Sequence, residues 1–365
     1  GVRIMAYTTI DDPSAHFQMV LYTGNGGSNA ITNGGNSDLQ PDWTWIKERS
    51  STSSHQLIDS SRGDASLYSD GTGQEDAINY FTENSDGFTL AANNGINQSS
   101  QTNVAWQWKA NGGTTTTNDA SATSVGDTDS VYQVNSTSKF SIVTWTGSGS
   151  GTVSIAHGLG STPKFLIIKQ RNGANSWLVY HHKNTIVDDA HDTFLKLHLN
   201  NASSADDNNY FMDNTAPTST VATFGTGNEA NQSGTYVGYF FDEVQGYSKF
   251  GVYAGNGNAN GPFVYTGFKP AWVMVKKVND AHSWYIQYGS TNIDSGDQGS
   301  NPVKSSLQAN SNSADATENS MDFLSNGFKI KTSGNGHNTD DGTYIYMAFA
   351  EHPFVSSEGV PVTAR

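Results

Sequence analysis

The chain has 365 residues, of which 35% are hydrophobic and only 15% charged, and it carries a formal net charge of −15 with no cysteine. The acidic balance argues against a basic nucleic-acid-binding face, and the absence of thiols excludes disulfides, thiolate metal sites and a cysteine nucleophile. No apolar run reaches about 18 residues, so we expect no membrane insertion.

Glycine, serine, threonine and asparagine take the place of charged and aliphatic residues, and aromatic residues still reach 11%. Turn formers combined with aromatic and β-branched residues are typical of an all-β protein and not of a disordered chain. Residues 1–13 lack the apolar centre of a signal peptide. Two interpretations of the start stay open: a preceding segment is missing, or Met5 is a natural start.

Three similar segments each open with a predicted strand and a glycine turn. An apolar or aromatic stretch runs into Gly-x-Gly at residues 17–26, 140–149 and 248–257. Glycine tolerates positive φ, so this pattern indicates a turn at the end of a strand. A phosphate-binding loop would need a third glycine and a following helix, and the pattern offers neither.

The second block of each copy begins with proline and alternates large apolar residues, at 41–49, 163–171 and 270–277. Alternate residues share one face of a strand, and the predicted faces are formed by Trp43 and Trp45, by Phe165 and Ile167, and by Trp272 and Met274. A lysine ends each strand on that face, and we expect its ammonium to reach water. A polar loop and a returning segment follow at 54–57, 176–179 and 283–286, which predicts a hairpin.

The repeats predict three tandem antiparallel β-sandwich domains of jelly-roll-like form. The predicted units cover residues 6–112, 132–243 and 244–355, followed by a tail at 356–365. Residues 113–131 contain no aromatic residue, and this composition favours a linker or surface loop. We therefore expect unit one to act apart from the other two units. Helical periodicity is nearly absent, and residues 190–199 alternate at period two, which predicts a strand.

Candidate chemistry is weak in this sequence. No Ser/His/Asp arrangement stands in the context that nucleophilic catalysis requires, and the paired aspartates at 188–189, 206–207 and 340–341 favour solvated loops. The densest set of metal-ligating residue types is His181, His182, Asp188, Asp189 and His191, and it occurs only in unit two. Residues 206–209 lack the spacing of a calcium loop. We therefore predict no catalytic residue, no metal and no cofactor, with a polysaccharide depolymerase as the minor alternative.

Aromatic side chains edged by amides are a more serious candidate, because such surfaces hold sugars. Trp177 and Trp284 occupy matching positions, where unit one carries His55. Period-two positions favour the core, whereas Trp106 and Trp108 share one face and are our prediction for an exposed patch. The candidate contacts to a glycan or partner are Trp106, Trp108, Trp177, His181, His182 and Trp284.

These repeated blocks resemble a family of structural proteins of tailed bacteriophages, common in marine and cyanobacterial phages. The segments that carry the resemblance are 5–13, 22–26, 41–49, 59–63, 261–270, 323–328 and 343–354. The family is known under names such as tail fibre, head fibre and decoration protein, and it brings no catalytic residues with it.

The resemblance implies a non-enzymatic protein of the virion surface, acting on capsid or tail through contacts with other virion proteins. It also implies a homo-oligomer, with a trimer favoured. The alternative is a receptor-binding adhesin that recognises a host-surface glycan.

Overall fold

The computed structural model describes residues 6–186, 188–206, 209–289 and 301–362, so Met5 lies outside the described residues. The chain is 42% strand and 5% helix, and its sheets are antiparallel, which confirms the all-β sandwich-type prediction. Within the described ranges, no helix is long and apolar enough to cross a membrane.

Unit one opens with a short 3₁₀ helix and contains a six-stranded and a three-stranded sheet, ordered β1-β9-β3-β4-β5-β6 and β2-β8-β7. Its elements are η1 (Pro13–Ala15), β1 (Phe17–Thr23), β2 (Asn29–Ile31), β3 (Trp43–Glu48), β4 (Gln56–Asp59), β5 (Ala65–Leu67), β6 (Asp76–Ala77), β7 (Phe81–Glu83), β8 (Phe88–Leu90) and β9 (Thr102–Trp108).

Unit two contains an eight-stranded and a two-stranded sheet, ordered β10-β11-β12-β19-β14-β15-β16-β17 and β13-β18. Its elements are β10 (Thr116–Asn118), α1 (Ala120–Thr123), β11 (Ser130–Asn135), β12 (Phe140–Gly147), β13 (Val153–Ala156), β14 (Phe165–Gln170), β15 (Leu178–His181), η2 (Ala190–Asp192), β16 (Thr193–Lys196), β17 (Ser204–Ala205), β18 (Val221–Phe224), α2 (Asn228–Asn231) and β19 (Gly234–Phe241).

The described residues of unit three form one eight-stranded sheet, ordered β20-β27-β22-β23-β24-β25-β26-β21. Its elements are β20 (Ser248–Ala254), β21 (Phe263–Tyr265), β22 (Phe268–Lys277), β23 (Trp284–Tyr288), β24 (Val303–Gln308), β25 (Ala316–Leu324), β26 (Gly327–Ile330), α3 (Asn335–Asn338) and β27 (Thr343–Pro353).

The same five-strand order recurs in each unit, as β1-β9-β3-β4-β5, β12-β19-β14-β15-β16 and β20-β27-β22-β23-β24. The predicted hairpins are confirmed, because β3 pairs with β4, β14 with β15 and β22 with β23. The second layer is β2-β8 in unit one, β13-β18 in unit two and β21-β26 in unit three. Of the strand predicted at 190–199, only residues 193–196 form a strand, β16, and residues 190–192 form the short 3₁₀ helix η2 instead.

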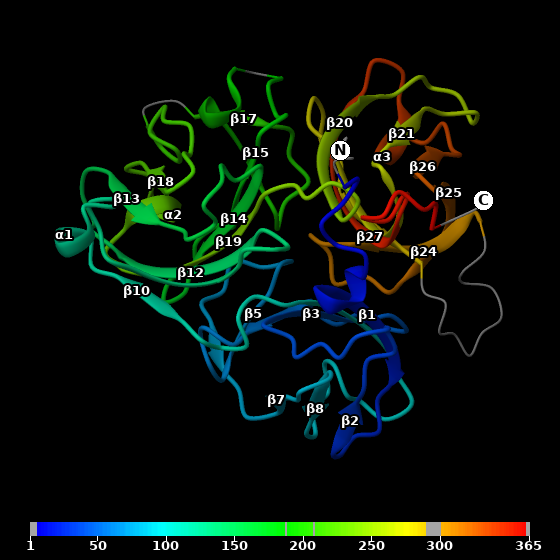
Figure 1. The fold of residues 1–365 in the computed structure, drawn as a ribbon, viewed down its shortest axis with the longest axis horizontal. Helices are drawn as coiled ribbons and strands as arrows, with labels where there is room; N and C mark the ends of the chain where they lie inside the picture. The colour runs from blue at the N-terminus through cyan, green and yellow to red at the C-terminus, as the bar shows by residue number, and fades with distance from the viewer. Residues whose placement is uncertain (1–5, 187, 207–208, 290–300, 363–365) are drawn as a thin grey trace.

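Each central strand is buried on both faces. In β3, Trp43 and Trp45 belong to a core that all three units share, whereas Ile46 packs into the separate core of unit one. The predicted faces of β14 and β22 enter the same shared core. Figure 1 shows the result as three lobes around a common centre, with the blue-to-cyan unit below and the other two above it.

The prediction that unit one acts apart is wrong, because this shared core joins it to the other two units. Aromatic rings meet across the boundaries: Trp43 stacks on Tyr239 of unit two at 4.3 Å, and Phe17 stacks on Phe349 of unit three at 5.2 Å. The segment 113–131 is also held in place, since β10 pairs with β11 and Gly113 N donates to Asp42 Oδ1 over 2.8 Å.

The prediction for the strand-ending lysines is also wrong, because Lys47, Lys169 and Lys276 are buried with their ammonium groups. Lys169 Nζ donates to the carbonyls of Gln170 (2.7 Å) and Gly173 (2.8 Å). Lys47 and Lys276 likewise donate to the carbonyl of the next residue along the chain. Carbonyl groups at the strand's end replace water as the partners of the charge.

The predicted Gly-x-Gly turns are confirmed, with φ of +73° at Gly26, +75° at Gly149 and +63° at Gly257. Each turn is closed by a buried asparagine that precedes the last strand of its unit, namely Asn97, Asn231 and Asn338. The backbone carbonyl of each asparagine accepts from the second glycine of the turn.

Candidate functional site

The tryptophans predicted as an exposed patch are inside the molecule. Trp106 is 0% exposed and Trp108 is 1% exposed. Trp106 meets Tyr288 of unit three edge-on at 5.4 Å, and Trp108 meets Trp272 of unit three edge-on at 5.9 Å. They share one face of β9, as predicted, but that face is covered by a neighbouring unit. They therefore cannot contact a glycan in this fold.

The other aromatic candidates, Trp177 and Trp284, are buried as well, and they reveal how the units are joined. Trp177 Nε1 of unit two donates to Tyr68 O of unit one over 2.9 Å. Trp284 Nε1 of unit three donates to Lys196 O of unit two over 3.1 Å. In unit one the matching residue, His55, bonds Gln308 O of unit three through Nε2 at 3.0 Å. The three contacts form a closed ring.

His55 acts as the counterpart of a tryptophan because of its tautomer. Trp45 Nε1 donates to His55 Nδ1 over 2.8 Å, so the ring proton of His55 is on Nε2 and points at Gln308 O. Burial lowers the pKa of His55 to about 3, which keeps the ring neutral.

His181 and His182 also join units, and neither belongs to the group of described residues whose ligand atoms lie close together, Asp189, His191 and Asp192. His181 Nε2 lies 3.1 Å from Tyr346 O, and His182 Nε2 lies 2.8 Å from Phe250 O, both acceptors in unit three. His181 Nδ1 accepts from Lys183 N over 3.1 Å. Burial lowers the pKa of His181 to about 3. Both side chains therefore contact another unit of the same chain and not a separate molecule.

A second repeated contact runs around the ring in the opposite direction. Asp315 N of unit three donates to Arg49 O of unit one over 2.8 Å, and Glu75 N of unit one donates to Arg171 O of unit two over 2.7 Å. The third contact joins Ser203 N of unit two to Val278 O of unit three over 2.8 Å. Each seam between two units thus carries at least one side-chain and one backbone hydrogen bond at corresponding positions, beside other contacts such as those of His181 and His182.

Among the described residues, arginine–carboxylate pairs strengthen two of the three seams, and in the third seam Lys249 of unit three binds Glu243 at the end of unit two over 2.8 Å. Arg171 binds both carboxylate oxygens of Glu75 at 2.9 Å, and Arg49 binds Asp315 at 2.9 Å. Val278 stands at the third corresponding position, so that seam has an aliphatic residue in place of the arginine. The Lys-x-Arg pattern in the first two copies was the sequence signal for this contact.

Two members of the metal-like set identified in the sequence, Asp189 and His191, come together, and Asp192, which was not in that set, joins them. Asp189, His191 and Asp192 offer ligand atoms within 4.8 Å of one another, and His191 Nε2 lies 3.6 Å from Asp192 Oδ2. In segment 206–209, which lacks the spacing of a calcium loop, Asp206 accepts from the backbone N–H groups of Phe211 (2.7 Å) and Met212 (2.8 Å). Residues 207–208 of that segment lie outside the described residues.

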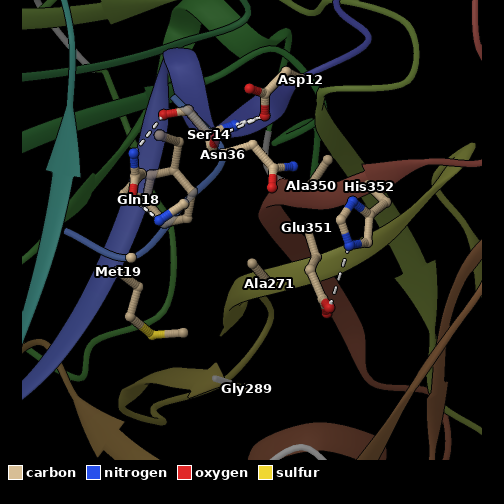
Figure 2. A pocket seen from close by; sticks show the side chains of 13 residues that line it. Asp12, Ser14, Gln18, Met19, Asn36, Ala271, Gly289, Ala350, Glu351 and His352 are labelled. Atoms are coloured by element: carbon tan, nitrogen blue, oxygen red, sulfur yellow. Dashed lines mark hydrogen bonds and ion pairs between the residues drawn. The ribbon is translucent and has the colours of Figure 1, made fainter. Parts of the chain in front are cut away.

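A cleft of about 260 Å³ opens at the seam between units one and three, and Figure 2 shows its lining. Its polar groups bind one another: Asp12 Oδ1 accepts from Ser14 N over 3.0 Å, and Gln18 Nε2 donates to Ser14 O over 2.9 Å. On the opposite wall, His352 Nε2 lies 3.7 Å from Glu351 Oε1. Figure 2 shows Ser14 and His352 on opposite walls, so the cleft does not assemble a nucleophile beside a base.

One family match is found, to the family described as Domain of unknown function (DUF7483), and it covers residues 12–353. The match spans all three units and the segments between them. No curated protein and no solved structure matches the chain.

Proposed function

The chain belongs to the DUF7483 family, and we propose that it is a non-enzymatic structural protein of a tailed-phage virion surface. In this proposal it acts as a fibre or decoration protein through contacts with other virion proteins. The observation that supports it best is the closed ring of three units around one aromatic core. Close packing of that kind makes a body that keeps its shape while its outer loops meet a partner.

The internal repetition supports a structural role in a second way. Three-fold arrangements usually come from three identical chains. Here one chain supplies three similar units with corresponding contacts, so each unit is free to differ in its loops. A homotrimer of whole chains, which the resemblance implies, stays a prediction, and the proposal does not depend on it.

The net charge of −15 fits docking onto a basic neighbouring surface. The polar groups of the cleft in Figure 2 are largely engaged with one another, which fits a protein that works through its surface.

Cryo-electron microscopy of purified particles of the phage that encodes the chain tests the proposal. The expected result is density for the three-unit ring on capsid or tail, with ordered contacts to neighbouring virion proteins. Mass spectrometry of the same particles provides the control for presence. If purified particles contain no copy of the chain, the structural role is wrong.

A further inference from the structure

Unit three contains a cleft of about 590 Å³ between its central sheet and the loop that leads into α3. The residues that matter for its chemistry are Tyr285, Glu318, Ser320, Lys331, Asn335 and His337. The cleft lies away from the three seams, on the side of β23 that faces the second layer. Its interest comes from comparison with the other two units.

In unit one the corresponding place is filled by Tyr80. Phe81 pairs with Leu90 at the start of β7, and Met321 pairs with Ile330 in β25, so Tyr80 and Ser320 are equivalent. Tyr80 hydroxyl donates to Gln56 Oε1 over 2.7 Å, and Gln56 is the equivalent of Tyr285. Unit three therefore has a serine where unit one has a tyrosine ring.

Unit two fills the same place with a tyrosine from a different segment. Tyr210 lies against Gly227, the residue that precedes α2, and stacks on Phe194 at 5.4 Å. In unit three Gly334 precedes α3, and a methyl group placed on it would meet only the Thr332 side chain within 4 Å. Two units close this position with a tyrosine, and the third leaves it open.

The lining of the open cleft is polar and of mixed charge. Glu318 interacts with the hydroxyls of Ser306 and Ser320, and burial raises its pKa. Lys331 lies 3.4 Å from Asp322 and remains 41% exposed. The lining residues Ser320 and His337 are held by the buried amide of Gln287, whose Nε2 donates to Ser320 Oγ over 3.3 Å and lies 2.9 Å from His337 Nε2. Gln287 Oε1 is buried there without a hydrogen-bond partner.

We propose that this cleft binds one pyranose ring of a glycan, in the place that a tyrosine ring fills in units one and two. A bare apolar ring would leave Gln287 Oε1 without a partner and would shield Glu318 from water, and both effects cost free energy. A pyranose has a similar footprint and carries hydroxyls that both donate and accept, while Tyr285 supplies an aromatic wall. The site goes beyond the structural role and does not rest on it.

The test uses the full chain with a panel of free neutral and acidic monosaccharides, by saturation-transfer NMR and calorimetry. At least one sugar is expected to bind, weakly, as single rings do. Ser320→Tyr installs the residue of unit one and is expected to weaken that binding by at least about tenfold. Glu318→Gln keeps the shape of the cleft and should weaken binding as well.

Two controls separate loss of the site from loss of the fold. Lys331→Ala alters only an exposed side chain at the rim, so a change in binding without a change in thermal unfolding locates the site. Asn258→Ala, in an exposed loop of the same unit, should leave binding unchanged. The proposal is overturned if no sugar of the panel binds, if only inorganic anions such as sulfate bind, or if binding survives Ser320→Tyr, Glu318→Gln and Lys331→Ala.

Discussion

Lys47, Lys169 and Lys276 each end a central strand with a buried ammonium that donates to the carbonyl of the following residue. Burial lowers the pKa of Lys47 and Lys169 to about 8 and that of Lys276 to about 7. In the unfolded chain a lysine titrates near 10.4. The folded state therefore holds these protons less tightly than the unfolded state does.

This difference predicts that the protein becomes more stable as the pH rises from about 7 to about 9. In that window the unfolded lysines keep protons that the folded ones release, so the free energy of unfolding increases with pH. Urea denaturation midpoints at pH 7, 8 and 9 measure the effect. Lys169→Met removes one of the titrating groups and should flatten the rise. A midpoint that falls or stays level in the wild type would contradict the prediction.

Buried histidines give a second pH dependence, on the acid side. Burial lowers the pKa of four of them, His55, His157, His181 and His337, and that of the partly buried His198, to about 3 or 4. An unfolded histidine titrates near 6.5, so between about pH 6.5 and pH 4 the unfolded state binds protons that the folded state does not bind.

We therefore predict a progressive loss of stability as the pH falls through that window, with the seams that His55 and His181 bridge affected directly. Thermal unfolding at pH 7, 6, 5 and 4 measures it. Carboxylates contribute too, so the specific check is His181→Asn, which should reduce the slope between pH 6.5 and pH 4. A variant with the wild-type slope would show that His181 does not titrate in this way.

At the scale of strands and turns, sequence alone predicts which residues share a face but not what covers that face. The alternation of Trp43 and Trp45 correctly predicts β3 and its hairpin. For Trp106 and Trp108 the alternation correctly predicts that both side chains share one face, but the prediction that this face is exposed is wrong. Residues of unit three, which are distant in the sequence, cover it. One available signal is the run Phe165–Ile168, which is apolar at both parities and so indicates a strand buried on both sides.

The seams were partly visible in the sequence and partly not. The matched positions of His55, Trp177 and Trp284 were found, but their acceptors are backbone carbonyls, which have no sequence signature. The turn-closing asparagines were missed, although each stands three to five residues before the start of its unit's last strand. Compared across three copies, they form a pattern that alignment of the repeats can reveal.

Those asparagines give an element-scale prediction. Asn338 Nδ2 donates to Asn256 Oδ1, Asn258 O and Thr332 O, and its Oδ1 accepts from Asn256 N. Asn338→Ala leaves these buried groups unpaired and is expected to cost about 2–4 kcal/mol of unfolding free energy. The matched control is Asn258→Ala, whose exposed side chain accepts one bond from Asn260 N and should cost well under about 1 kcal/mol. Equal losses from the two changes, measured by urea denaturation, would refute the special role of Asn338.

At the scale of the whole molecule, the shared core makes the three units one structure. A tandem array of sandwiches would bury only one face of each central sheet within its own unit. Here the second face of each central sheet is buried against the other two units, in a core that contains residues of all three. Removing one unit would expose that face on both of the others. We therefore expect states in which a single unit is unfolded to be unstable.

Differential scanning calorimetry of the full chain tests this account most directly. The closed ring predicts a single transition in which the ratio of the calorimetric to the van't Hoff enthalpy is about 1. It also predicts that a fragment of units two and three alone, residues 113–362, does not reach the stability of the whole. Two or three separable transitions, or a fragment as stable as the full chain, would contradict the closed ring of three units.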